Sequence, residues 1–169
     1  MDPETFRTRT TRHPGPGGKP LLRFTHDYPD PPERVWRAIT DSEEHSSWFG
    51  FPVVVEPVEG GNVTVTFSPE MVERARVVEV DEPLRFVYAG DGDAYRWLLS
   101  PHGDGCRLVL ENVVGDPRHL PQSAAGFHLA LDKMGELLDR EAGRPAPHGG
   151  PLSFDDLVKH YSELPEQAN

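Results

Sequence analysis

The sequence has little positive charge, almost no cysteine and no long hydrophobic run. Among its 169 residues, 28 Asp and Glu stand against 17 Lys and Arg, so the formal net charge is −11. No basic cluster outside the first twenty residues could neutralise a phosphate backbone, which argues against nucleic acid and against an anionic membrane surface. The single cysteine, Cys106, excludes an internal disulfide. No segment resembles a signal peptide or a membrane span, so we expect no membrane insertion and a cytoplasmic location.

Motifs for metal or covalent chemistry are also missing. No two of the eight histidines are spaced as H-x-x-H or H-x-x-x-H, the separations that place two ligands on one helix face. Alternation places Cys106 on the inner side of a predicted strand, which favours a buried inert thiol over a nucleophile. There is no G-x-S-x-G elbow and no glycine-rich phosphate loop. We therefore expect no metal, no cofactor and no assigned catalytic residue.

One long amphipathic helix is predicted over Leu120–Arg140. Pro121 suits its first turn, and Gly143 ends it. Gly126 and Gly135 each weaken a helix by roughly 1 kcal/mol relative to alanine, which indicates either space for a ligand or close packing on a sheet. Apolar residues at steps of three and four form one stripe: Ala124, Phe127, Leu131, Met134 and Leu138. The opposite face is charged: Asp132, Lys133, Glu136, Asp139 and Arg140.

A half-buried strand and two short helices are predicted ahead of this region. Residues 21–28 alternate between apolar and polar side chains, which is typical of a strand with one wet face. Asp30 is placed to cap a first helix, with two prolines in its first turn. A second short helix, Ser42–Trp48, follows with Asp41 or the preceding threonine as its cap.

From residue 51 to residue 116 the hydrophobic period is two, which predicts six further strands joined by hairpin-length turns. Because neighbouring strands usually pair, the sheet should be antiparallel. A strand, two short helices, six strands and a long helix make an α+β fold. We expect a curved antiparallel sheet of about seven strands wrapped round the long C-terminal helix, with a cavity wherever the two separate.

The two ends of the chain differ in composition from the folded part. Met1–Pro20 alternates Arg with Thr and then becomes rich in Pro and Gly, so we expect a disordered arm. We place the folded domain at residues 21–143. Residues 144–169 should form a Pro/Gly-rich tail with a short amphipathic helix, for which Ser153 is a plausible N-cap.

Two segments make the fold more specific. Tyr28–Asp41 (YPDPPERVWRAITD), with the later Trp48, resembles the opening of START-like proteins of the SRPBCC superfamily. Within that superfamily the chain is similar to the activator-of-heat-shock-protein-ATPase homologue group, and Val77–Tyr88 (VVEVDEPLRFVY) resembles a hairpin of the same group. The similarity covers about residues 21–143 and implies the helix-grip fold. It implies no reaction, because the superfamily includes lipid carriers, hormone-binding proteins, polyketide cyclases and co-chaperone domains.

Candidate ligand-binding residues come from the concave face of the sheet and from the long helix. They are apolar, or polar with an apolar body, as a site for a small apolar or amphipathic molecule requires. We predict Phe67, Phe86, Tyr88, Tyr95, Trp97, Leu110, Phe127, His128, Leu131 and Met134.

Three functions fit these features. The first, which we favour, is a non-enzymatic START-like protein that holds a small hydrophobic or amphipathic molecule between sheet and helix. The second is an aromatase/cyclase-type enzyme that uses His128 or a pocket tyrosine in the same cavity. The third is an interaction protein acting on a chaperone, which only the resemblance implies. A homodimer is a further expectation.

Overall fold

The computed structural model describes residues 1–145 and 152–168, and its elements follow the predicted order. The helices are α1 (Pro32–Thr40), α2 (Ser42–Phe49), α3 (Leu120–Ala142) and α4 (Phe154–Tyr161). The strands are β1 (Arg9–Pro14), β2 (Pro20–Tyr28), β3 (Val53–Val55), β4 (Asn62–Ser68), β5 (Met71–Asp81), β6 (Arg85–Gly90), β7 (Ala94–His102) and β8 (Gly105–Val113). Residues 146–151, which contain most of the predicted Pro/Gly-rich stretch, lie outside the described residues.

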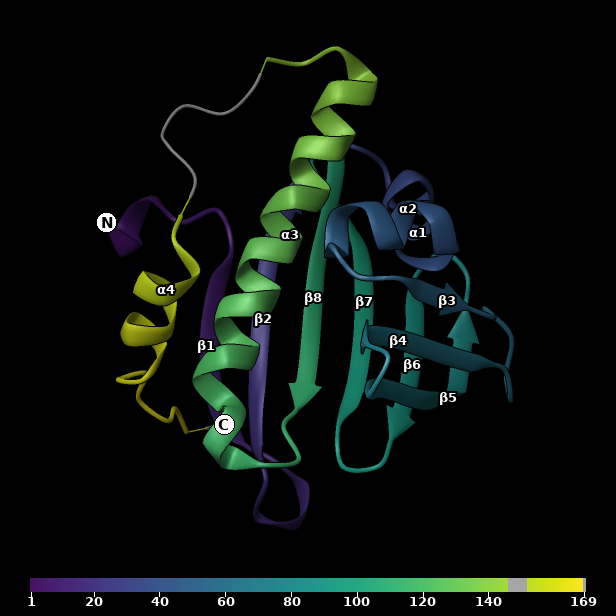
Figure 1. The fold of residues 1–169 in the computed structure, drawn as a ribbon. Helices are drawn as coiled ribbons and strands as arrows, with labels where there is room; N and C mark the ends of the chain where they lie inside the picture. The colour runs from purple at the N-terminus through teal and green to yellow at the C-terminus, as the bar shows by residue number, and fades with distance from the viewer. Residues whose placement is uncertain (146–151, 169) are drawn as a thin grey trace.

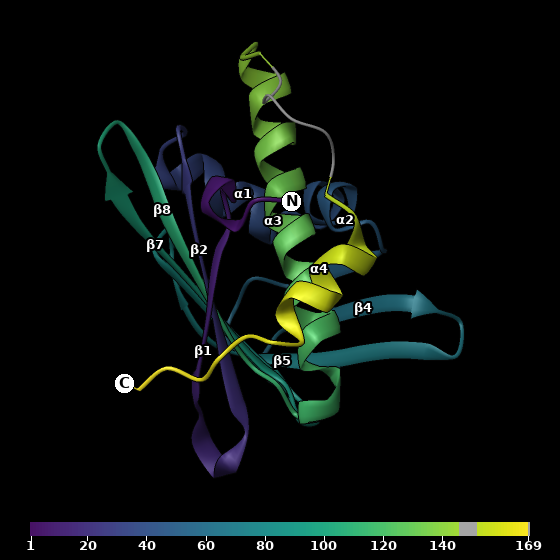
Figure 2. The same ribbon diagram turned by 90° about the vertical axis from the view of Figure 1, so that its left-hand side faces the viewer.

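The eight strands form one antiparallel sheet in the order β1-β2-β8-β7-β6-β5-β4-β3. The sheet curves round α3, which lies along its inner face, while α1 and α2 cover the neighbouring part of that face (Figure 1, Figure 2). This arrangement confirms the predicted α+β helix-grip fold. The sheet has one strand more than expected, and the extra strand is β1.

The prediction of a disordered arm over Met1–Pro20 is wrong. Residues 9–14 pair with β2 as an edge strand, in a register that sets Arg9 opposite Thr25. A second contact closes the outer side of this strand, where the amide of Gln167 donates to the carbonyl of Arg12 at 2.7 Å. Edge pairing uses main-chain groups, so it does not need the apolar side chains whose absence suggested disorder.

The core fills the space between β2, the neighbouring strands and α3. The alternation in β2 is confirmed, because its inward side chains are buried while Arg23, Thr25 and Asp27 are more exposed. The Tyr28 hydroxyl donates to the carbonyl of Leu131 on α3 at 2.8 Å. Most of the predicted apolar stripe of α3 is fully buried: Ala124, Leu131, Met134 and Leu138. Phe127, the remaining member of the stripe, is only half-buried and lines a cavity described below.

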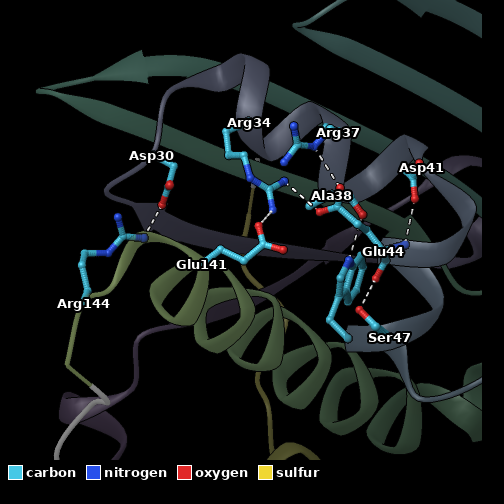
Figure 3. A network of polar contacts seen from close by, with 10 residues as sticks. Asp30, Arg34, Arg37, Ala38, Asp41, Glu44, Ser47, Glu141 and Arg144 are labelled. Carbon is cyan, nitrogen blue, oxygen red and sulfur yellow. Dashed lines mark hydrogen bonds and ion pairs between the residues drawn. The ribbon is translucent and has the colours of Figure 1, made fainter.

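Charged side chains hold α1, α2 and the C-terminal end of α3 together (Figure 3). Arg34 on α1 pairs with Glu44 on α2 at 2.8 Å and also contacts Glu141 on α3. Asp30 does not cap α1, as we had predicted. Pro31 occupies the N-cap position without a side-chain bond, and Asp30 instead pairs with Arg144, just beyond α3. The acidic residue before α1 therefore fixes the end of a distant helix.

The two helix glycines of α3 do not border an empty space of ligand size. A Cβ on Gly135 would stand 3.5 Å from the Tyr28 ring, an ordinary packing distance, and one on Gly126 would meet nothing within 4 Å. Gly135 therefore packs against β2, and Gly126 lies on an open part of the helix surface. The predicted ending is confirmed: Gly143 stops α3 in the left-handed region, with φ at 71°.

Helix α4 packs against α3 through Leu157 and Tyr161, which are both buried. Its predicted cap is confirmed, because the Ser153 side chain accepts a bond from the amide of Asp156. The helix covers the face of α3 that lies beside β1 (Figure 2). Among the described residues, no helix combines the length and the hydrophobicity needed to cross a bilayer.

Candidate functional site

A cavity of about 230 Å³ lies between α2, α3 and strands β4 to β7. It is larger than the roughly 150 Å³ space that admits benzene and smaller than the ~300–1,000 Å³ of pockets for drug-sized ligands. Its volume therefore suits a molecule of one or two rings. The lining residues are His45, Phe49, Val63, Val65, Val72, Glu73, Arg74, Ala75, Tyr88, Gly90, Asp91, Asp93, Tyr95 and Phe127.

Aromatic rings form a continuous wall of this cavity. The ring centroids of Tyr88 and Tyr95 are 5.1 Å apart, those of Tyr95 and Phe127 are 5.8 Å apart, and those of Phe127 and Phe49 are 6.0 Å apart. These separations are typical of tilted aromatic contacts. The wall presents ring faces and edges from four elements, which suits a flat or partly aromatic ligand.

His45, on α2, contributes one unpaired acceptor to the cavity lining. Its Nδ1 lies 2.7 Å from the carbonyl of Ile39, which assigns the proton of the neutral ring to Nδ1 and leaves Nε2 as an acceptor. No group among residues 1–145 and 152–168 bonds to Nε2. The ring is 3% exposed and stacks on Trp48, with centroids 4.3 Å apart. Burial lowers the pKa of His45 to about 4, so the ring is neutral at pH 7.

Two carboxylates approach a single hydroxyl at another part of the cavity. The Tyr95 hydroxyl lies 3.5 Å from Glu73 Oε1 and 3.4 Å from Asp93 Oδ2. Asp93 is held in place by the amide of Gly115 at 2.8 Å and by the Asn112 side chain at 3.3 Å. Although Glu73 is exposed over more than a third of its surface, partial burial of its carboxyl and then the charge of Asp93 raise its pKa. In the part of the chain that the structure describes, neither carboxylate forms an ion pair.

The two tyrosines of the wall stay protonated. The Tyr88 hydroxyl accepts a bond from Trp97 Nε1 at 3.1 Å and is buried. Burial raises the pKa of Tyr88 and of Tyr95 well above the ordinary value. Each hydroxyl can therefore donate a hydrogen bond at neutral pH, and neither can act as a base.

Three of the ten predicted ligand-binding residues line this cavity: Tyr88, Tyr95 and Phe127. Phe67 lies just outside the lining, in contact with Phe49 and with the exposed ring of Phe51 at centroid distances of 6.4 and 4.9 Å. The remaining apolar candidates belong to the close-packed core and are fully buried there: Phe86, Trp97, Leu110, Leu131 and Met134. The helices pack on the sheet without a gap at these positions, and the cavity lies farther along, beneath α2.

His128 lies on another side of α3, away from the cavity, which contradicts its predicted role in the site. Its Nδ1 is 2.6 Å from the Tyr161 hydroxyl on α4, and its Nε2 is 3.4 Å from Asp132 Oδ2. Thr8, from the N-terminal segment, donates to Asp132 Oδ1 at 2.7 Å and lies 2.8 Å from His26 Nδ1. We call Thr8, His26, His128, Asp132 and Tyr161 the buried polar network. It joins both ends of the chain to α3, and it covers most of the Asp132 side chain on the predicted charged face.

His45 and the two carboxylates were missed by the sequence interpretation. One signal was available for Glu73, because it lies on the same face of β5 as Ala75 and Val77. That face is also the cavity face, since Glu73 stands opposite Val65 in the β4–β5 ladder. For His45, the signal was its place one turn before Trp48 on the apolar side of a short helix.

Metal and thiol chemistry find no support in this geometry. Within residues 1–145 and 152–168, no three or more His, Cys, Asp or Glu side chains are grouped so that they could hold a metal ion. Cys106 is buried, and burial raises the pKa of its thiol to about 11. The thiol is therefore protonated and a poor nucleophile at neutral pH.

The fold recurs in several solved structures. CalU16 from Micromonospora echinospora is 22% identical, with a TM-score of 0.69 over 93% of this chain and 96% of that chain. EF2215 from Enterococcus faecalis, a conserved protein of unknown function, is 16% identical, with a TM-score of 0.73 over 92% and 89%. DynU16, from the dynemicin biosynthetic locus, is 20% identical, with a TM-score of 0.62 over 76% of this chain and 49% of that chain. At these identities the likeness concerns the fold.

Sequence comparison leads to a family. No curated protein matches the chain significantly. The family model described as Activator of Hsp90 ATPase homolog 1-like protein matches residues 30–139. That range runs from the start of α1 through most of α3 and includes every residue that lines the cavity. Since the match spans well over half of the sequence, this chain belongs to the Activator of Hsp90 ATPase homolog 1-like protein family.

Proposed function

We propose that this protein binds a small amphipathic molecule with one or two rings in the cavity beneath α2. The observation that carries the proposal is the 230 Å³ space itself, lined by aromatic rings together with a few polar groups at fixed positions. Protein interiors are close-packed, so a space of this size beside aromatic rings supports a ligand site. Fatty acids and sterols are too large for this volume, so the ligand class is narrower than the sequence alone suggested.

The alternative of an aromatase/cyclase-type enzyme is weakened, because His128, its first candidate residue, is bonded within the buried polar network. The tyrosines of the wall remain in the cavity, but their raised pKa values suit hydrogen-bond donation to a ligand and not proton abstraction. The family description names activation of Hsp90. Among residues 1–145 and 152–168, the cavity is the feature that favours ligand binding over that function.

The test is calorimetric titration and thermal unfolding with 2-naphthol as the probe. At a hundred times its dissociation constant, a bound ligand stabilises the fold by about 2.7 kcal/mol. For a domain of this length that raises the melting temperature by roughly 5–10 °C. We expect Val65→Phe to remove this shift, because the larger ring fills the cavity from β4.

A matched control lies next to Val65 on the same strand. Thr64 has nearly the shape of valine, and its side chain points to the opposite face of the sheet, so Thr64→Phe should leave probe binding intact. Failure of the wild-type protein to bind 2-naphthol and other one- and two-ring probes would refute the proposal and favour an interaction domain.

A further inference from the structure

We propose that the ligand of this cavity carries a positively charged amine next to an aromatic ring. The inference rests on the proposed ligand-binding function and adds the chemical class of the ligand. Most polar side chains that line the cavity accept hydrogen bonds. The exceptions are the tyrosine hydroxyls and one arginine.

The charge around the cavity is unbalanced. Three carboxylates contribute to its lining, namely Glu73, Asp91 and Asp93, against the single guanidinium of Arg74. Among residues 1–145 and 152–168, no ion pair within 4 Å involves any of these four residues. Lys19 donates to the carbonyl of Gly92, between Asp91 and Asp93, at 3.3 Å and not to a carboxylate. The carboxylates therefore keep their charge available to a ligand.

Glu73 and Asp93 converge on one point. Both lie within 3.5 Å of the Tyr95 hydroxyl, which has one proton and can satisfy only one of them fully. Asp93 is fixed by Gly115 and Asn112, so it cannot turn away from its neighbour. An ammonium group has three donors, and placed between these carboxylates it would pair with both and remove their mutual repulsion.

A second, independent group points to a donor-bearing ligand. His45 is 97% buried, its Nδ1 is committed to the carbonyl of Ile39, and its Nε2 is left with no partner in the described structure. This nitrogen is not sealed from solvent, so water can bond to it, and a ligand hydroxyl or N–H in the cavity would take the place of that water. The aromatic wall of Phe49, Phe127 and Tyr95 is suited to an aromatic ring and attracts a cation to its ring faces.

The experiment compares three probes of nearly equal shape: 2-phenylethylamine, which is a cation at pH 7, neutral 2-phenylethanol and anionic 3-phenylpropanoate. Affinities are measured by calorimetry at low salt with the full chain. We expect the amine to bind tightest and the carboxylate weakest. A charge-assisted hydrogen bond corresponds to roughly a tenfold to hundredfold preference for the amine over the alcohol.

Glu73→Gln keeps the shape of the side chain and removes its charge. It should reduce amine binding to nearly that of the alcohol. Glu70→Gln is the matched control, since it removes the same charge from the exposed turn between β4 and β5, outside the lining. It should keep the preference.

The outcomes separate the two proposals. If 2-phenylethanol binds and the amine binds no tighter, the inference is wrong and the ligand-binding function stands. If the preference is lost equally in both glutamine variants, it comes from the net charge of the protein, and the assignment to this site is wrong. If none of these probes binds, the inference is wrong, and the titration with 2-naphthol decides whether the ligand-binding function stands. Even if a variant does not fold, an amine that binds the wild-type protein no tighter than the alcohol refutes the inference.

Discussion

Two buried histidines should make this fold sensitive to mild acid. His26 and His45 are 4% and 3% exposed, and burial lowers the pKa of each to about 4. For His26, the nearby carboxylate of Asp132 partly opposes this effect. In the unfolded chain both rings titrate at their ordinary value near 6.5. Between these two values the unfolded state binds more protons than the folded state.

The sign and size of the effect follow from that difference. The free energy of unfolding has its full value above pH 6.5, decreases as the pH falls toward 4, and levels off below pH 4. At pH 5 each histidine removes about 2 kcal/mol from the free energy of unfolding, so the pair removes about 4 kcal/mol. This is a large part of the 5–15 kcal/mol typical of a domain. Glu73 acts in the opposite direction, because its raised pKa lets the folded state take up a proton first.

Urea unfolding at pH 7.5, 6.5, 5.5 and 5.0 measures this loss directly. His45→Asn keeps an N–H donor for the carbonyl of Ile39 and removes the titration, so it should halve the loss between pH 7.5 and pH 5. His119→Asn, at an exposed position before α3, controls for the loss of a histidine. A wild-type protein with constant stability over this range would refute the reasoning, as would a His45→Asn variant that keeps the full acid sensitivity.

Two further predictions concern the helix glycine and the N-terminal segment. Gly126→Ala should raise the free energy of unfolding by about 0.5–1 kcal/mol, because the added methyl meets nothing within 4 Å and the helix gains propensity; a loss of stability in urea unfolding would contradict this. Thr8→Val should cost roughly 1–3 kcal/mol, since His26 and Asp132 each lose a partner in a buried place. Thr5→Val, at an exposed position, should change stability by less than about 0.5 kcal/mol, and equal stability of the two valine variants would mean that the segment does not dock.

Features set by neighbouring residues could be predicted from the sequence. The caps by Asp41 and Ser153 and the stop at Gly143 depend on a few residues and on backbone geometry, and the structure confirms all three. The alternation in β2 and the stripe on α3 depend only on the period of each element. These local patterns were enough to define the helix-grip fold.

Features set by several distant segments could not be predicted in the same way. The cavity arises where α2, α3 and four strands fail to fill the space between them. The hydrophobic period of any one element does not predict such a gap. Leu131 and Phe127 share one stripe, yet one is fully buried in the core and the other lines the cavity. Asp132 was assigned to the charged face of the long helix, opposite the apolar stripe. The segment that buries it lies more than a hundred residues earlier in the sequence.

The pairing of β2 with β8 also constrains how the chain reaches this structure. Leu21 stands opposite Val113, so this pair of strands joins residues from the two ends of the domain. Contacts of such long sequence separation carry a large loop-closure cost and slow folding. During synthesis, β4 to β7 can pair as successive hairpins while β2 still lacks its partner β8. The sheet is completed only after β8 has emerged from the ribosome. Until then the apolar face of β2 is not covered by the finished sheet and core.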